Sequence, residues 1–159
     1  FQGLVRFVSS HSGAFASFDY ACGYSGSDQN YLLKNPFAQM TITPYMMGRI
    51  VDLELFLKDY PFKKQALTFA LEVTDDPYAQ WNEGIFEITV SNAEVKIEKV
   101  TETKLPTISG TIQRMTQLLM GYRQMEELVF YNHIQLSTEA LLEMAPCFPS
   151  QQPILNDYF

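Results

Sequence analysis

Apolar and polar residues alternate in three stretches near the middle of this chain. Every second residue is apolar from 67 to 73, from 86 to 90, and again at 95 and 97. A period of two predicts strands with one buried face. The Ser91-Asn92 pair separates the second stretch from the third and predicts a hairpin turn. The polar positions of the third stretch, which we expect to face solvent, are Glu94, Lys96 and Glu98.

Apolar residues recur at helical spacing in several other segments. These segments are Leu4–Val8, Leu53–Leu57, Ile112–Leu119 and Thr138–Ala145. Asp52 and Ser137 precede two of them and are expected to cap the helices. Gly121 is expected to end the third segment, and residues 122–130 to add one or two further turns.

One more strand is expected from about Gln39 to Ile50, with Pro44 breaking it at an edge or a domain crossing. Strands followed by helices predict an α+β fold. We therefore expect a mainly antiparallel sheet with helices on one face.

The first forty residues form short pieces without an obvious closed core. A short helix ends at the polar run from Ser9 to Gly13, and a Gly/Ser-rich loop covers residues 23–29. We expect these pieces to be the end of something larger, with apolar side chains such as Phe7 left uncovered. Phe1-Gln2-Gly3 is either a tag remnant or natural sequence.

The charge of the chain limits its partners. The 159 residues carry a formal net charge of -7, and 47% of them are hydrophobic, which is enough for a sizeable core. A negative chain repels phosphate backbones and anionic membranes, so no nucleic-acid or membrane partner is expected. Without an apolar run of about 20 residues or an export signal, the protein is expected to be soluble and cytoplasmic.

Four oxygen-bearing residues gather in one predicted loop, and they are Asp75, Asp76, Asn82 and Glu83. Such groups can hold calcium. Their spacing does not match a calcium loop, however, and Pro77 and Trp81 intrude. Because Asp, Asn, Pro and Gly are ordinary turn formers, a turn between two strands is favoured over a metal site.

The candidates for nucleophilic chemistry are weak. Cys22 and Cys147 lie far apart, and the histidines are His11 and His133. Nothing around Cys147 would lower the pKa of its thiol, so a buried inert thiol is favoured over a Cys-His pair. Six methionines on predicted strand or helix faces are expected to fill the core, with a lipid-binding cavity as the alternative. They are Met46, Met47, Met115, Met120, Met125 and Met144.

The chain closes on an apolar, aromatic tail from Pro153 to Phe159. Such a tail is expected to be docked, which would carry the free carboxylate of Phe159 to a fixed place. From the residues alone, a tail that only finishes a sheet or fills a groove is favoured over a catalytic one.

Several motifs together resemble the C-terminal part of the enhanced intracellular survival (Eis) family of bacterial GNAT N-acetyltransferases. The motifs are Pro44–Leu57 with Tyr60-Pro61-Phe62, Val73–Asp75, Trp81–Phe86, Thr111–Tyr122 and Leu155–Phe159. The resemblance implies that residues 1–43 end a central GNAT-like domain, and that residues 44–159 form a sterol-carrier-like C-terminal domain.

The resemblance also implies a catalytic role for the C-terminus. In that family, acetyl-CoA binds the N-terminal GNAT domain, where a tyrosine is the general acid, and the C-terminal carboxylate is the base toward the substrate amine. At the matching position this role falls on Phe159. This part of the chain is expected to bind no acetyl-CoA and no metal. Tyr158 stands where some members have an acid, so a preference for aminoglycosides is not implied.

Three functions follow as hypotheses. The first is the C-terminal part of an Eis-like acetyl-CoA-dependent N-acetyltransferase, inactive alone, whose partners are the missing GNAT domains, an amine substrate and other copies of itself. The second is an autonomous sterol-carrier-like lipid-binding module. The third is a purely structural or oligomerising domain.

Overall fold

The computed structural model describes residues 2–11, 13–14, 47–63, 66–92, 94–149 and 153. Residues 46–153 form one compact unit of the chain. Outside that unit, helix α1 (Gln2–Ser10) confirms the helix expected around Leu4–Val8, and its Phe7 side chain is 63% exposed. The expected domain boundary at residues 43 and 44, Cys22, Met46 and Phe159 lie outside the described residues.

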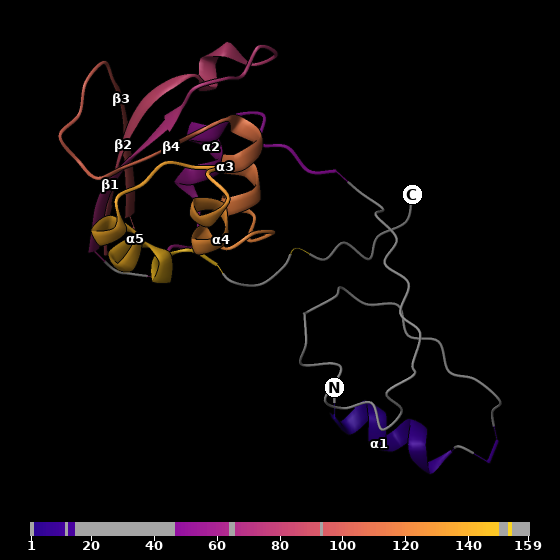
Figure 1. Cartoon of the computed structure of the whole chain (residues 1–159). Coiled ribbons are helices and arrows are strands. Elements are labelled where there is room, and N and C mark those ends of the chain that lie inside the picture. Colours follow the sequence, from indigo (N-terminus) through magenta and orange to yellow (C-terminus); the bar gives the residue numbers. More distant parts are fainter. Residues whose placement is uncertain are drawn as a thin grey trace. The chain divides into compact units, whose positions relative to one another are not determined.

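A four-stranded sheet forms one layer of the unit 46–153 (Figure 1). Its strands are β1 (Ala66–Val73), β2 (Gly84–Ser91), β3 (Glu94–Val100) and β4 (Thr107–Gly110), in the order β3-β2-β1-β4. The pairs β1–β2 and β2–β3 are antiparallel, whereas β4 runs parallel to β1. The mainly antiparallel sheet is therefore confirmed, and β4 is a strand that the sequence pattern did not predict.

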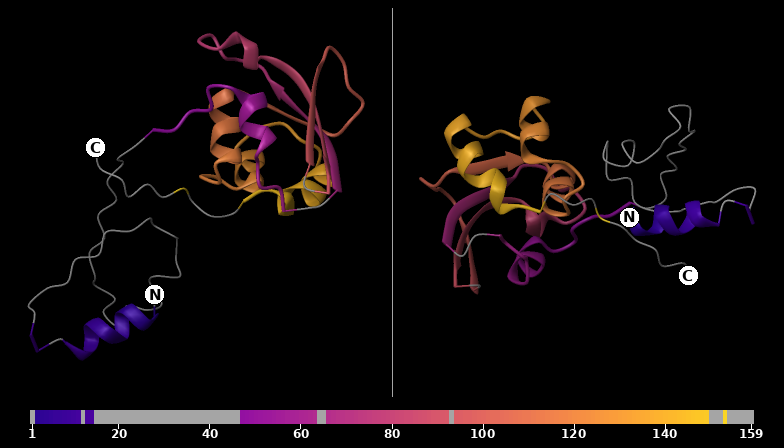
Figure 2. Two further views of the ribbon diagram at one scale, coloured as in Figure 1. Left: turned by 180° about the vertical axis from the view of Figure 1, so that it is seen from behind. Right: turned by 90° about the horizontal axis from the view of Figure 1, so that it is seen from below.

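Helices form the second layer, against one face of the sheet (Figure 2). They are α2 (Leu53–Lys58), α3 (Ile112–Leu119), α4 (Met125–Phe130) and α5 (Thr138–Met144), with short 3-10 turns at Gln80–Asn82 and Ala145–Cys147. Both expected caps are present. The Asp52 carboxylate accepts a hydrogen bond from the Leu55 amide at 2.8 Å, and the Ser137 hydroxyl accepts one from the Ala140 amide at 3.3 Å. These bonds satisfy amides that a helix start leaves without a partner.

The alternation read from the sequence matches the two faces of the sheet. On β2, Phe86, Ile88 and Val90 are buried against the helices. They pair across the β2–β3 ladder with Lys99, Ile97 and Val95. The expected solvent-facing positions of β3, namely Glu94, Lys96 and Glu98, are exposed. Asn92, at the hairpin turn, adopts a φ of 50°, a conformation that Asn tolerates better than most residues.

The strand expected up to Ile50 is wrong for its described part, because residues 47–50 belong to no strand. The Ile50 amide donates to the Thr116 hydroxyl at 3.3 Å rather than to a neighbouring strand. A side-chain partner thus takes the place of a backbone ladder, which the alternation of residue types cannot reveal. The part of this expected strand before residue 47 lies outside the described residues.

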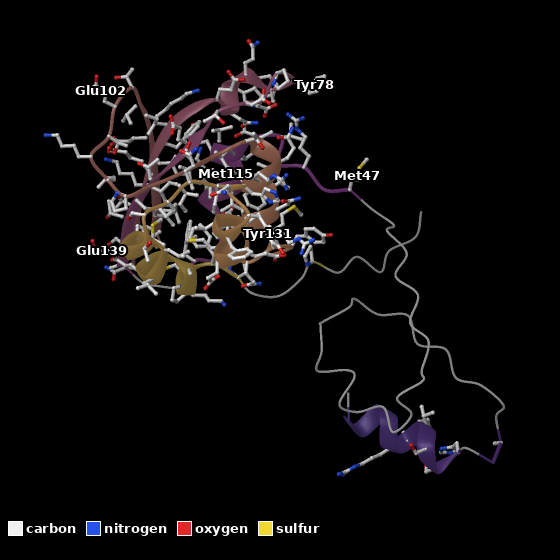
Figure 3. The ribbon with its side chains drawn as sticks, in the orientation of Figure 1. Met47, Tyr78, Glu102, Met115, Tyr131 and Glu139 are labelled. Carbon is white, nitrogen blue, oxygen red and sulfur yellow. The ribbon has the colours of Figure 1, made fainter. Side chains whose placement is uncertain are left out.

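The methionine prediction is confirmed at some positions and wrong at another. Met115, Met125 and Met144 are buried in the core, as expected for gap-filling side chains. Met47 is instead completely exposed, and Figure 3 shows its side chain pointing away from the domain, whereas Met115 lies inside it. It precedes Ile50, where burial of this segment begins.

No helix among the described residues is both long and apolar enough to cross a membrane.

Aromatic rings close one end of the core. The Tyr60 ring lies 4.5 Å from Phe62 and 6.4 Å from Phe148, measured between ring centroids. Its hydroxyl donates to the Leu119 carbonyl at 2.7 Å. Burial raises the pKa of Tyr60 well above its ordinary value of 10.0, because a phenolate is poorly solvated in the core.

We expect Tyr60 to make the domain sensitive to alkali. The unfolded chain ionises this phenol near pH 10 while the folded domain keeps it neutral. The contribution of Tyr60 to the free energy of unfolding is therefore complete below that pH, and it is lost as the pH rises toward the raised pKa of Tyr60 in the folded domain. The free energy of unfolding should fall by up to about 1.4 kcal/mol per pH unit in this window. Urea unfolding of Tyr60→Phe should show a shallower fall than the native chain, and the exposed Tyr122→Phe should not. Equal slopes in all three proteins would contradict this expectation.

Candidate functional site

The loop between β1 and β2 holds a buried carboxylate. The Asp76 side chain is completely buried, and the guanidinium of Arg49 pairs with its Oδ1. The same oxygen accepts a hydrogen bond from the Ala79 amide at 3.0 Å, and Oδ2 accepts one from Asn82 Nδ2 at 2.9 Å. The Asp76 amide in turn donates to Glu83 Oε1 at 2.8 Å. Protein donors thus surround the carboxylate.

Two opposing effects set the acidity of Asp76. Burial by itself raises the pKa of this carboxyl, because the charged form loses its water. The hydrogen bonds from Asn82 and Arg49, the positive charge of Arg49 and the Ala79 amide outweigh burial and hold the pKa below its ordinary value. Asp76 therefore stays ionised at neutral pH, as a buried anion with a cationic partner.

Asn82 links this carboxylate to the segment that leads into α2. The side chain is 1% exposed. Its Nδ2 also donates to the Val51 carbonyl at 3.0 Å, and its Oδ1 accepts from the Leu53 amide at 2.8 Å. Trp81 Nε1 donates to the same Val51 carbonyl at 2.9 Å. The loop after β1 therefore binds the backbone of residues 51–53 through side chains.

This arrangement is the turn that the sequence favoured, with a structural role added to it. The Asp76 oxygens bind protein donors, which leaves the carboxylate poorly placed for a cation. Among the residues that the structure describes, no group of three or more His, Cys, Asp or Glu side chains is arranged to hold a metal ion. In the described part of the chain, the hydrogen bonds of this loop therefore stabilise the local fold.

A shallow depression of about 290 Å³ lies beside this loop. It is lined by Asp52, Glu54, Trp81, Asn82, Phe86 and Lys99. Several of its polar groups have partners within the domain: Asp52 caps α2, Glu54 pairs with Lys58 at 3.4 Å, and Lys99 Nζ donates to the Trp81 carbonyl at 2.9 Å. These groups stabilise the local fold.

The remaining candidates from the sequence do not form a catalytic group in the described residues. Cys147 is completely buried, and its thiol lies 3.5 Å from the Glu143 carbonyl as a hydrogen-bond donor. This agrees with the interpretation of an inert thiol. His11 is exposed at the end of α1, with Nδ1 2.8 Å from the Phe7 carbonyl, and His133 is exposed after α4. Phe159 lies outside the described residues, so its proposed role rests on the resemblance.

Arg49 and Thr116 are the site residues that sequence reasoning missed. Arg49 pairs with a carboxylate 27 residues further along the chain, and Thr116 accepts from the Ile50 amide. No periodic pattern connects such positions. The available signal was the presence of Arg49 inside one of the motifs that carry the family resemblance.

The chain is similar to several solved structures. A conserved protein from Enterococcus faecalis V583, described as a probable N-acyltransferase, is 39% identical with a TM-score of 0.78, over 96% of this chain and 38% of that chain. A GCN5-related N-acetyltransferase from Anabaena variabilis ATCC 29413 is 25% identical with a TM-score of 0.55, over 66% of this chain and 26% of that one. A GCN5-related N-acetyltransferase from Kribbella flavida shares the fold at 17% identity and a TM-score of 0.58, over 70% and 28%.

This chain therefore spans well under half the length of each of these proteins. No curated protein matches it. The sterol carrier protein domain family matches residues 53–156, which include the four strands and the helices α2 to α5. Because this match covers more than half of the chain, the chain belongs to the sterol carrier protein domain family.

Proposed function

We propose that this chain is the C-terminal part of an Eis-like, acetyl-CoA-dependent N-acetyltransferase that acts on an amine. The observation that carries the proposal is the 39% identity, over 96% of this chain, to the Enterococcus faecalis protein described as a probable N-acyltransferase. This chain spans 38% of that protein, whose remaining length is enough for acetyl-CoA-binding domains. In this proposal such domains precede this chain in the protein of which it is the C-terminal part, which we call the longer protein. The motifs quoted for the Eis resemblance support the finer assignment.

In this proposal, Phe159 supplies its C-terminal carboxylate as the general base. The amine nitrogen attacks the carbonyl carbon of the acetyl thioester, a C–N bond forms, and the C–S bond breaks. The carboxylate accepts the proton that the nitrogen loses. The tyrosine that the resemblance places in the N-terminal GNAT domain protonates the departing thiolate. A base held within hydrogen-bond reach of its proton is effective, which favours a terminus fixed by a folded domain.

Exposed apolar side chains support the GNAT domains as partners. In the unit 46–153, Met47, Tyr78 and Phe130 are 100%, 84% and 78% exposed. In α1, Phe7 is 63% exposed, as expected for a segment whose covering layer is missing. Side chains exposed to this degree are available for burial by another domain or subunit. Homo-oligomeric assembly and a cytoplasmic location belong to the same proposal.

The proposal is tested by acetyl transfer. The longer protein should transfer the acetyl group of acetyl-CoA to a primary amine, followed through release of the coenzyme A thiol. Residues 1–159 alone should show neither transfer nor heat of acetyl-CoA binding in calorimetry, because they have neither a phosphate-binding loop nor a compensating basic cluster. A longer protein without transferase activity, or micromolar acetyl-CoA binding by residues 1–159, would overturn it.

Membership of the sterol carrier family favours a second candidate, an apolar-ligand carrier. The depression found in the described residues is small and lined mainly by polar groups. We therefore expect solvent extraction and mass spectrometry of the purified chain to give no stoichiometric lipid. One lipid per chain would favour the carrier function instead.

A further inference from the structure

Side chains, rather than a neighbouring strand, bind the backbone of residues 49–53. This segment follows residue 46, where the compact unit begins, and its last residue, Leu53, is the first residue of helix α2. It belongs to no strand, and side chains from two other segments bind its backbone groups. Ile50 and Leu53 are buried, whereas Met47 and Val51 are exposed. The attachment of the segment therefore depends on a few side chains and two apolar anchors.

A buried charge lies at the centre of this attachment. Asp76 is ionised and completely buried, whereas its partner Arg49 is 35% exposed. Burying an ion pair costs desolvation, and well-packed apolar residues often stabilise a core as well or better. What a buried, hydrogen-bonded ion pair adds is geometric selectivity, because few arrangements satisfy all its donors and acceptors. Here the donors and acceptors include the backbone at Val51 and Leu53, which Asn82 binds.

We propose that Asp76 is a positioning residue that forms a clasp with Arg49 and Asn82, and that the clasp fixes the direction in which residues 49–53 enter the sterol-carrier-like domain. The inference rests on the proposed function, since the consequence of a fixed direction is a fixed placement of this domain during acetyl transfer. Arg49 and Asn82 bind the carboxylate from the two sides. Asn82 also binds the backbone at Val51 and Leu53, so the loss of the carboxylate loosens both connections.

The clasp is expected to open without unfolding of the sheet. Arg49 is already partly in water, and residues 47–49, 51 and 52 are at least partly accessible. The backbone ladders that pair β1, β2 and β3 do not include this segment. A local opening of this kind exposes little surface and should therefore depend weakly on urea, unlike global unfolding.

Trypsin tests the clasp directly, because it cleaves after Arg49 and after Arg114, which lies within α3. In Asp76→Asn, cleavage between Arg49 and Ile50 should be about 10- to 100-fold faster than in the native chain, as expected when a charge-assisted hydrogen bond is lost. Low urea should leave this rate nearly unchanged while cleavage after Arg114 rises. The matched control is Glu127→Gln, which breaks the exposed pair with Arg123 and should change neither rate.

Catalysis by the longer protein tests the positioning role. Asp76→Asn should lower kcat at least about tenfold and leave KM for acetyl-CoA unchanged, because a misplacement of about 1 Å can cost 10²-fold. Arg49→Lys keeps the charge and the trypsin site, so its kcat should lie between those of Asp76→Asn and the native protein. It also serves as the second variant if Asp76→Asn folds poorly.

The two assays separate the possible failures. Cleavage after Arg49 that is unchanged in Asp76→Asn, or that follows the urea dependence of cleavage after Arg114, overturns the clasp whether or not the longer protein is an acetyltransferase. If the clasp opens but kcat stays at the native value, the positioning role is wrong and the acetyltransferase proposal stands. If the native longer protein transfers no acetyl group, the proposed function fails and the positioning role fails with it, while the trypsin result still decides the clasp.

Discussion

If the longer protein is the proposed acetyltransferase, extending the chain beyond Phe159 should lower its turnover by about 10²- to 10⁴-fold, the range typical of general-base catalysis. An added segment keeps the Phe159 ring but converts the carboxylate proposed as the base into a peptide bond, which cannot accept the proton of the amine. The expected loss corresponds to about 3 to 5 kcal/mol of activation free energy. Steady-state kinetics with acetyl-CoA and a primary amine would measure it.

Stability measurements supply the control for this experiment. The extension should leave the urea midpoint of unfolding unchanged, because it adds residues after Phe159 and changes no residue of the sheet or of the helices. Deletion of Phe159 is a less clean variant, since it removes the side chain together with the carboxylate. An extended enzyme with native kcat and a native pH profile would show that the tail has no catalytic role.

The strength of the periodic signal decided which strands could be predicted. β1, β2 and β3 each have seven or eight residues and at least two apolar side chains at alternate positions. β4 has four residues, of which Ile108 alone is both apolar and large. It becomes a strand because it pairs with the second half of β1 in parallel, from Ala70 to Val73. This pairing is a tertiary contact, and four residues are too few to show a period.

Helix ends were predictable because their signals are local. A carboxylate or hydroxyl before an apolar helical stripe satisfies amides two or three residues away, so Asp52 and Ser137 could be assigned without knowledge of the fold. Gly121 adopts a φ of 71° after α3, a left-handed conformation that glycine adopts at little cost. These positions need no distant partner.

The buried carboxylate could not be predicted for the opposite reason. The residue types in the loop at 75–83 indicated a turn, which is correct, but they do not show which acid is buried. Asp75 is exposed, whereas its neighbour Asp76 is completely buried and paired with Arg49. A buried ion pair between distant positions leaves no periodic trace in one sequence. The same limit explains Met47, whose residue type suggested the core although its position precedes the first buried residue of the segment.

The second large prediction concerns the stability of the core. Phe69 lies on β1, between β2 and β4, and is completely buried. Its ring centroid lies 5.9 Å from that of Phe62 and 5.8 Å from that of Phe148, both in edge-on contact. Phe69→Ala should lower the free energy of unfolding by about 3 to 5 kcal/mol, because it removes buried apolar surface and leaves a cavity that surrounding strands cannot fill. Urea denaturation at neutral pH would measure the loss.

Phe130→Ala is the matched control, since it makes the same chemical change where the side chain is 78% exposed. We expect it to change the free energy of unfolding by no more than about 0.5 kcal/mol. A domain of this size is stabilised by roughly 5 to 15 kcal/mol in total, so Phe69→Ala should remain measurable as a folded protein in most of that range. The urea m-value should stay unchanged in both variants, because each alters stability rather than the surface exposed on unfolding. Equal losses from the two substitutions would mean that the sheet and helices do not enclose Phe69 in solution, and the core described above would be wrong.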